Sequence, residues 1–240
     1  MLAVVAPGQG SQTPGFLTPW LDADFASQLI SEWSDAISLD IKRLGITADA
    51  DEIKDTANAQ PLLVAGGLIG AATLLAGDDS NISYFAGHSV GEITAAALAQ
   101  VFNGISAMKL VRTRGLEMAK AAHGTDTGMA AVLGGERDVV ISALTELGLT
   151  AANENGGGQI VAAGTNAALA KLSENPPAGS RVRPLAVSGA FHTLTMAPAV
   201  PVLAQLAKTL TIKDPKVSLL RSEEHTSELQ SPMYLVCRLL

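Results

Sequence analysis

The stretch "GHSVG" at 87–91 constrains the fold more than any other part of the chain, because it joins two segments of opposite character. The run before it, "ISYFAG" at 82–87, is short and continuously apolar, as in a buried strand. The run after it, 91–101, is rich in alanine and favours a helix. The pattern G-x-S-x-G between a strand and a helix has two interpretations, in which Ser89 is either a nucleophile or a structural turn residue.

Strand-like and helix-like segments alternate along the first half of the chain. A second apolar strand is expected at 2–6, and a polar stretch with helical spacing follows to about residue 55. Further helices are expected at 56–77, 91–101 and 105–122. The order strand, helix, strand, helix predicts a parallel sheet covered on both faces.

The composition changes after residue 125, where short segments with Gly-rich ends form a β-α-β-α-β series. Strands are expected at 127–135, 159–165 and 181–189, and helices at 137–148 and 166–175. This series predicts an inserted split βαβ subdomain. A helix of the main domain is expected at 190–210, with Pro198 and Pro201 in its first turn.

We therefore divide the 240 residues into four parts. The first part of a large α/β domain covers 1–125, the inserted subdomain covers 126–189, and the large domain continues over 190–220. The remainder, 221–240, has no clean period, and its "RSEEHTSELQS" resembles a translated sequencing-library adapter. We expect this tail to be non-native, so that His225 and Cys237 carry no function; the alternative is a divergent terminus.

Charge and cysteine content exclude several classes of protein. The formal net charge of −7 argues against a nucleic-acid partner, which requires clustered Lys and Arg. The single cysteine allows no disulfide framework and fits a reducing compartment. No basic patch precedes an apolar signal core, so we expect a cytoplasmic protein.

The uncharged stretch at 56–77 is long enough to cross a membrane. It contains Asn58, Gln60 and Pro61, which favour a buried helix over a membrane span. We therefore expect no membrane partner.

A serine nucleophile needs a base, and three histidines lie outside the tail. His88 adjoins Ser89 and is expected to point away from it. His123 ends a helix, where a positively charged side chain is common and needs no catalytic role. His192 follows the serine in chain order and opens the helix after an apolar strand, which favours it as the base. The alternative for His192 is a capping or core histidine.

Two further motifs leave their roles open. Arg112 and Arg114 both fall off the polar face of the 105–122 helix, at about 100° per residue. An arginine that points inward needs an anion, whereas one that extends along the surface reaches water, and helical geometry does not choose between them. The loop "PGQGSQTPG" at 7–15 lacks a Walker lysine, so it offers backbone N–H groups rather than a nucleotide site.

Taken together, the chain resembles the malonyl-CoA:acyl-carrier-protein transacylase family in its free-standing bacterial form. The resemblance runs from Met1 to about Leu220. The motifs that carry it are "APGQGSQ" at 6–12, "QPLL" at 60–63, "AGHSVGE" at 86–92, "LVRTRG" at 110–115, "NENGGGQIVAAG" at 153–164 and "SGAFHTLTM" at 188–196.

The resemblance implies a fold and a set of site residues. The fold is a hydrolase-like α/β domain with a parallel sheet and an inserted ferredoxin-like subdomain. Ser89 is the nucleophile and His192 the general base. Arg114 binds the malonyl carboxylate, and the backbone N–H groups of Gln9 and Val90 form the oxyanion hole.

The resemblance also implies the reaction. A malonyl group moves from coenzyme A to the phosphopantetheine thiol of acyl carrier protein through a malonyl-serine intermediate, in fatty acid biosynthesis. No metal or cofactor is expected, since the coenzyme A thioester is itself the substrate. Carrier proteins are acidic, so a local basic patch is needed, for which Lys109, Arg112 and Lys120 are candidates.

The sequence departs from the family pattern after the strand-like "VSLL". The family continues with a glutamine whose main-chain carbonyl orients the histidine, and with a Gly-Pro-Gly turn; neither is found in this chain. Thr193 replaces a usual serine, and Gly156-Gly157 replace a usual Ser-Pro. Two alternatives follow: a serine hydrolase or thioesterase of the elbow type, with an acidic third triad member, and an inactive module that only binds carrier protein.

Overall fold

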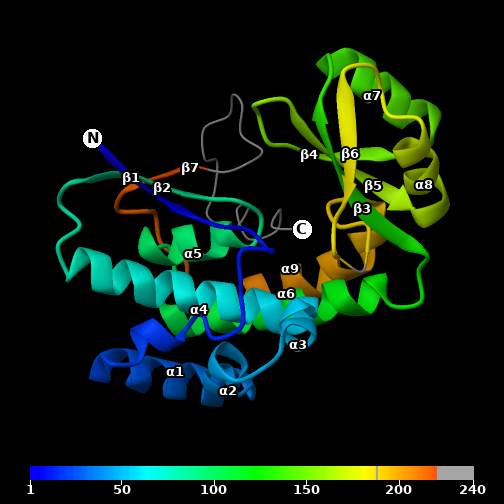
Figure 1. Ribbon diagram of the computed structural model, residues 1–240. Helices are drawn as coiled ribbons and strands as arrows, with labels where there is room; N and C mark the ends of the chain where they lie inside the picture. Colours follow the sequence, from blue (N-terminus) through cyan, green and yellow to red (C-terminus); the bar gives the residue numbers. More distant parts are fainter. Residues whose placement is uncertain (188, 221–240) are drawn as a thin grey trace. The chain divides into compact units, whose positions relative to one another are not determined.

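The computed structural model describes residues 1–187 and 189–220 (Figure 1). The chain divides into two compact units, which are described separately below. Of the described residues, the first contains Met1–Leu116 and 201–220, and the second contains the described part of Glu117–Val200. The expected non-native tail, with His225 and Cys237, lies outside the described residues.

The first unit contains a parallel sheet of three strands. These are β1 (Leu2–Ala6), β2 (Ile82–Gly87) and β7 (Ser218–Leu220), in the order β1-β2-β7. The strands expected at 2–6 and 82–87 are thereby confirmed at both ends. Ala6 pairs with Gly87, so the loop after β1 and the turn after β2 start at the same edge of the sheet.

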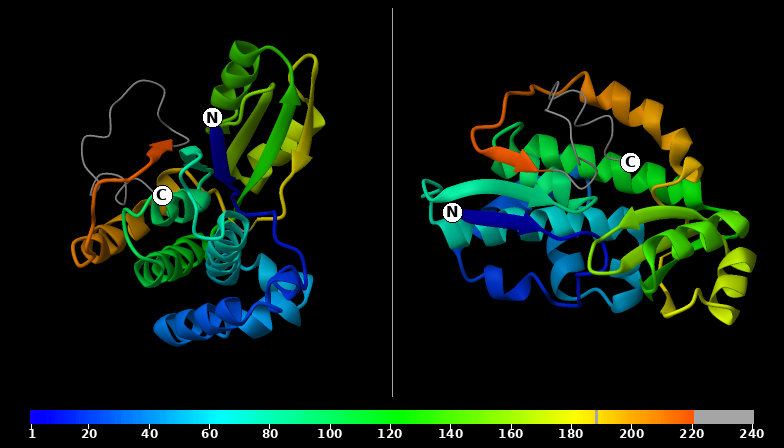
Figure 2. Two further views of the ribbon diagram at one scale, coloured as in Figure 1. Left: turned by 90° about the vertical axis from the view of Figure 1, so that its left-hand side faces the viewer. Right: turned by 90° about the horizontal axis from the view of Figure 1, so that it is seen from above.

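The helices of this unit lie in successive layers beside the sheet. α5 (Gly91–Leu98) packs on β1 and β2, α4 (Thr56–Leu75) packs on α5, and α2 (Ile41–Ile46) packs on α4 and on α1 (Asp24–Ile37). Figure 2 shows these layers from two further directions. Side chains of Leu2 and Val5 on β1 remain 51% and 68% exposed, which differs from the expected covering on both faces.

The polar stretch before residue 55 forms several short elements because aspartates divide it. The remaining elements are a 3₁₀ helix, η1 (Thr18–Trp20), and α3 (Ala50–Lys54). Asp40, Asp49 and Asp55 each accept a backbone N–H at the start of α2, α3 and α4, respectively. Such N-caps stabilise a new helix start, so the chain turns at each of them.

The apolar stretch at 56–77 forms the core helix α4. By length and composition it could cross a membrane, but 56% of its most apolar window is buried. Its close approach to α5 depends on Gly67, where a Cβ would lie 2.8 Å from the side chain of Thr94. The expected buried helix is therefore confirmed.

The second unit contains an antiparallel sheet of four strands in the order β4-β5-β3-β6. Its elements are β3 (Thr127–Gly134), α7 (Arg137–Glu146), β4 (Thr150–Glu154), β5 (Gln159–Thr165), α8 (Asn166–Glu174) and β6 (Ser180–Pro184). The two helices pack on one apolar core, which includes Val132, Val140, Leu144, Ile160 and Leu172.

Three details of the chain after residue 125 differ from the sequence prediction. Strand β4 was not expected, because "TAANE" has weak β propensity and gains its conformation from pairing with β5. Strand β6 ends at Pro184 instead of continuing to 189. The helix expected at 190–210 is instead a 3₁₀ helix, η2 (Leu194–Ala199), followed by α9 (Val200–Ala207).

Proline explains the break between η2 and α9. Pro198 lies inside η2 and Pro201 in the first turn of α9, and neither has an N–H for a continuous α-helix.

One further long helix, α6 (Gly104–Ala122), begins in the first unit and ends in the second. The domain limits of 126 and 189 follow the change in composition, and they stay predictions.

Candidate active site

The turn between β2 and α5 holds Ser89 in a backbone conformation that serine rarely adopts. Its φ is +52°, in the left-handed region. Three backbone hydrogen bonds fix the turn: His88 N–H donates to Ala6 O (3.1 Å), Gly91 N–H to His88 O (2.9 Å) and Glu92 N–H to Ser89 O (3.0 Å). Ser89 therefore occupies the apex of a sharp turn from strand to helix, as the G-x-S-x-G pattern requires.

The two glycines of this pattern are required by close backbone contacts. A Cβ at Gly87 would lie 2.2 Å from the carbonyl carbon of Gly91. A Cβ at Gly91 would lie 2.3 Å from the carbonyl oxygen of Ala6. Neither neighbour is a flexible side chain, so only glycine fits at these two positions.

Arg114 lies against Ser89, and its guanidinium is buried. The residue is 1% exposed. Its Nη2 donates to Ser89 Oγ at 3.1 Å, and its Nη1 donates to Gln60 Oε1 at 2.8 Å. Arg112 differs, because it is partly buried and donates from Nη1 to the backbone oxygen of Ala57 at 2.8 Å. Of the two arginines on α6, only Arg114 contacts the serine in the described part of the chain.

Burial shifts the basicity of both arginines. It lowers the pKa of Arg114 to about 10, well below the usual value of an arginine, while the carboxylate of Glu92 acts in the opposite direction. It also lowers the pKa of Arg112, and Asp55 opposes that change. Arg114 is therefore a fixed cation at neutral pH, next to the serine hydroxyl.

The loop after β1 runs beside the turn that carries Ser89. A Cβ at Gly8 would lie 2.7 Å from Nδ1 of His88, which shows how closely the two segments approach. Gln9, the next residue, donates from Nε2 to Thr56 Oγ1 at 3.3 Å, which ties the loop to the start of α4. Val90 is fully buried and is the N-cap of α5.

His192 belongs to the second unit, where it also has a left-handed backbone, with φ +57°. The prediction that it opens a helix is wrong, because Thr193 is the N-cap of η2. Thr193 Oγ1 donates to Ala190 O at 2.6 Å and accepts from Thr195 N–H at 3.2 Å, so its side chain fixes the turn. His192 is half-buried, whereas His123 is exposed after the end of α6.

Gln60 and Glu92 are two buried polar residues near Ser89 and Arg114 to which the sequence motifs assigned no role. Both are buried, at 1% and 4% exposure. The available signal was a polar side chain within an apolar run: Gln60 lies inside the apolar helix α4, and Glu92 lies in the first turn of the alanine-rich α5.

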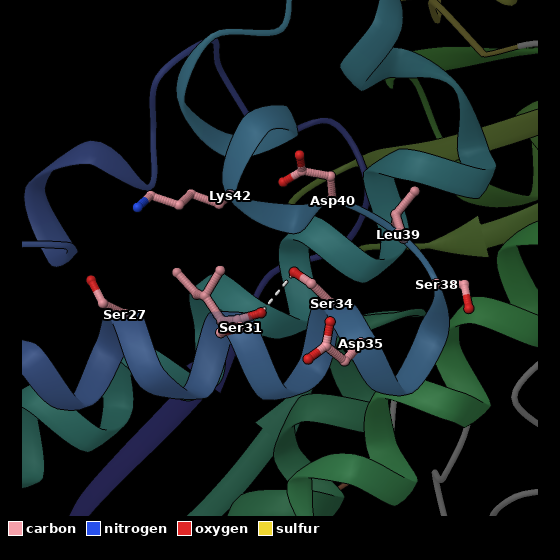
Figure 3. Close-up of a pocket in the computed structure, with 9 residues that line it drawn as sticks. Ser27, Ser31, Ser34, Asp35, Ser38, Leu39, Asp40 and Lys42 are labelled. Atoms are coloured by element: carbon pink, nitrogen blue, oxygen red, sulfur yellow. Dashed lines mark hydrogen bonds between the residues drawn. The ribbon is translucent and has the colours of Figure 1, made fainter.

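A separate hollow of about 580 Å³ lies in the first unit between α1 and α2 (Figure 3). It is lined by Ser27, Ile30, Ser31, Ser34, Asp35, Ser38, Leu39, Asp40 and Lys42. Ser34 donates to Ile30 O and accepts from Ile41 N–H, and Asp40 caps α2, so these groups serve the helix ends. Within residues 1–187 and 189–220, no group of three or more His, Cys, Asp or Glu side chains could hold a metal ion.

Comparisons with known proteins place this geometry in a family. Residues 4–234 match the acyl transferase domain family. The malonyl CoA-acyl carrier protein transacylase of Mycobacterium tuberculosis is 51% identical over 229 residues, which cover 93% of this chain and 75% of that protein.

Solved structures agree with this match. The crystal structure of MCAT from Mycobacterium tuberculosis has a TM-score of 0.92 and 48% identity, and covers 99% of this chain and 80% of that one. A malonyl-transacylase in complex with a type II polyketide acyl-carrier protein has a TM-score of 0.90 and 28% identity, with the same two coverages. The resemblance inferred from the sequence motifs is thereby confirmed: the chain belongs to the malonyl-CoA:acyl-carrier-protein transacylase family.

Proposed function

We propose that this protein transfers a malonyl group from coenzyme A to the thiol of acyl carrier protein, through an ester on Ser89. Membership of the family supports this function, and so does the relative solved with an acyl-carrier protein. The observation that carries the proposal is the buried guanidinium of Arg114, 3.1 Å from Ser89 Oγ. A fixed cation beside a nucleophile suits an acyl group that ends in a free carboxylate.

In the first half-reaction, Ser89 Oγ attacks the thioester carbonyl carbon of malonyl-CoA while His192 accepts the hydroxyl proton. The N–H groups of Gln9 and Val90 stabilise the tetrahedral oxyanion, at about 3 kcal/mol for each donor. The C–S bond then breaks, and the departing sulfur of coenzyme A takes the proton from His192. A malonyl ester remains on Ser89.

The position of Val90 supports its part in this step. The next three N–H groups, of Gly91, Glu92 and Ile93, donate to the carbonyls of His88, Ser89 and Val90 within the turn. Val90 N–H precedes them at the start of α5, where the helix dipole favours negative charge.

In the second half-reaction, the carrier thiol gives its proton to His192 and its sulfur attacks the ester carbonyl. The bond between the carbonyl carbon and Ser89 Oγ breaks, and the serine recovers the proton from His192. Substrate and product are both thioesters, so the exchange needs no cofactor and no oxidant. We place the reaction in the cytoplasm, in fatty acid biosynthesis.

Arg114 selects the acyl group in this proposal. Its N–H groups form paired, charge-assisted hydrogen bonds with a carboxylate, which an acetyl group lacks. A simple serine hydrolase has no use for this buried cation, so the site favours malonyl transfer over the hydrolase alternative.

The test is mass spectrometry of the protein after incubation with malonyl-CoA. We expect a malonyl adduct on Ser89 that disappears when carrier protein is added, with malonyl recovered on the carrier. Ser89→Ala should give no adduct. Arg114→Ala should keep an adduct but lose the preference for malonyl-CoA over acetyl-CoA. A wild-type protein that forms no adduct, or an Arg114→Ala variant with the wild-type preference, would refute the proposal.

A further inference from the structure

Two opposite charges are buried in the first unit. Among residues 1–187 and 189–220, Glu92 and Arg114 are the charged side chains with less than a tenth of their surface exposed, at 4% and 1%. A buried ion is stable only when another charge or several hydrogen bonds compensate for its lost hydration. Each of these two residues therefore needs compensation from nearby.

Both charges belong to the surroundings of Ser89. Glu92 follows the serine by one helical turn, and its N–H donates to Ser89 O at 3.0 Å. Arg114 reaches Ser89 Oγ at 3.1 Å from α6. Gln60, which accepts a hydrogen bond from the other guanidinium nitrogen, is an uncharged amide and does not balance the charge. The carboxylate of Glu92 opposes the lowering of the Arg114 pKa that burial causes.

We propose that Glu92 is the resident counter-charge of Arg114 and thereby sets how strongly the site holds an acyl carboxylate. This inference rests on the proposed malonyl transfer. The opposite charges of Glu92 and Arg114 offset each other, and a malonyl carboxylate becomes a second anion beside one cation. The attraction is then moderate, which lets the malonyl group leave for the carrier. Glu92 is a specificity-determining residue in this account, not a catalytic one.

Removing the charge of Glu92 should strengthen the binding of malonyl-CoA and slow the transfer of malonyl to the carrier. In Glu92→Gln the malonyl carboxylate no longer competes with the Glu92 carboxylate for Arg114. We expect KM for malonyl-CoA to fall on the order of tenfold and transfer to the carrier to slow by a similar factor. KM for acetyl-CoA should not change, because acetyl carries no charge. Glu146→Gln, an exposed change at the end of α7 with the same loss of charge, should leave all three values unchanged.

A stability cycle tests the charge pair without reference to activity. Glu92→Gln and Arg114→Gln should each lower Tm by on the order of 10 °C, because each leaves one buried charge unbalanced. The double variant should be more stable than either single variant, since both charges are then gone. Free malonate should raise the Tm of Glu92→Gln more than that of the wild type.

The outcomes separate this inference from the proposed function. If the wild type forms no malonyl-serine, the proposed function fails. If the wild type forms it, but the stability losses of the two single variants add in the double variant, or KM for malonyl-CoA does not fall in Glu92→Gln, the counter-charge role is overturned. If Glu92→Gln does not fold, the double variant still decides, because recovery of folding supports the pair and continued failure refutes it.

Discussion

At Ser89 one backbone angle decides what the side chain can reach. A φ of +52° projects the hydroxyl from the apex of the turn, and such conformations cost about 1–3 kcal/mol. The surrounding turn sustains this cost because Gly87 and Gly91 allow close backbone packing and because hydrogen bonds from the N–H groups of His88 and Glu92 fix its two sides. The strain is therefore local to the residue that the proposed chemistry uses.

The lowered pKa of Arg114 predicts a pH dependence of acyl selectivity. A guanidinium is charged below its pKa, so with a value of about 10 it is charged at neutral pH and loses its charge as pH rises through that value. The ratio of kcat/KM for malonyl-CoA to that for acetyl-CoA, which reports the free enzyme, should fall above about pH 10. In Arg114→Ala the ratio should be low at every pH. A wild-type ratio that stays constant up to about pH 11 would contradict the assignment.

The sequence located the serine but could not choose between the two arginines. Helical geometry placed Arg112 and Arg114 alike, off the polar face of α6. They differ in their contacts with α4: Arg114 donates to the side chain of Gln60, and Arg112 donates to the backbone carbonyl of Ala57. Helical spacing does not reveal contacts between distant segments, so the choice of Arg114 came only from the resemblance to a family.

Among the elements, α4, α5 and the parallel sheet are packed through small residues. Gly67 admits Thr94 between α4 and α5, and Gly91 lets α5 approach the carbonyl of Ala6 at the end of β1. These approaches fix α5, and with it the position of Ser89 relative to the loop after β1. The close packing of α4, α5 and β1 thus holds Ser89 in its left-handed backbone conformation.

Two glycine substitutions should have opposite effects on stability. In Gly91→Ala the new Cβ lies 2.3 Å from a backbone oxygen, so we expect a loss of about 3 kcal/mol in the free energy of unfolding. In Gly70→Ala, inside α4, the nearest atom lies 3.6 Å from the new Cβ, so helix propensity should add about 0.5–1 kcal/mol. Urea denaturation of the two variants measures the difference. Equal effects would show that close packing at the turn is not decisive.

The strands and helices that could be predicted are those whose own residues clearly favour one conformation. The strands at 2–6 and 82–87 are continuous apolar runs, and they form at those residues. Strand β4 was missed because its residues favour no conformation strongly and β5 supplies its hydrogen bonds. The helix expected at 190–210, with Pro198 and Pro201 in its first turn, does not form as one element, because the two prolines divide it into η2 and α9.

For the whole molecule, a net charge of −7 is unfavourable for meeting an acidic carrier protein, so local cations matter. The three candidates from the sequence differ in the structure. Arg112 is partly buried and engaged with Ala57 O, and Lys120 lies 3.8 Å from the carboxylate of Glu117. Lys109 is exposed on α6. It is therefore the candidate best suited to meet a carrier.

Reversing the charge of Lys109 should affect one half-reaction only. We expect Lys109→Glu to raise KM for acyl carrier protein several-fold at low salt, and less at high salt because ions screen surface charges. Formation of malonyl-serine from malonyl-CoA should not change. Lys213→Glu, another exposed lysine, is the matched control. If both variants behave alike, net charge rather than a docking position explains the effect.

The hydrogen bond from Arg114 Nη2 to Ser89 Oγ should lower the nucleophilicity of the serine hydroxyl when no substrate is bound. It occupies one of the two lone pairs of the hydroxyl oxygen, which is the nucleophile in the proposed reaction. An acyl chain that ends in a carboxylate competes for the same N–H and so liberates the oxygen at the moment its own carbonyl arrives. An acyl chain without that group leaves this hydrogen bond in place, so in the proposed reaction we expect discrimination in the rate of attack as well as in binding.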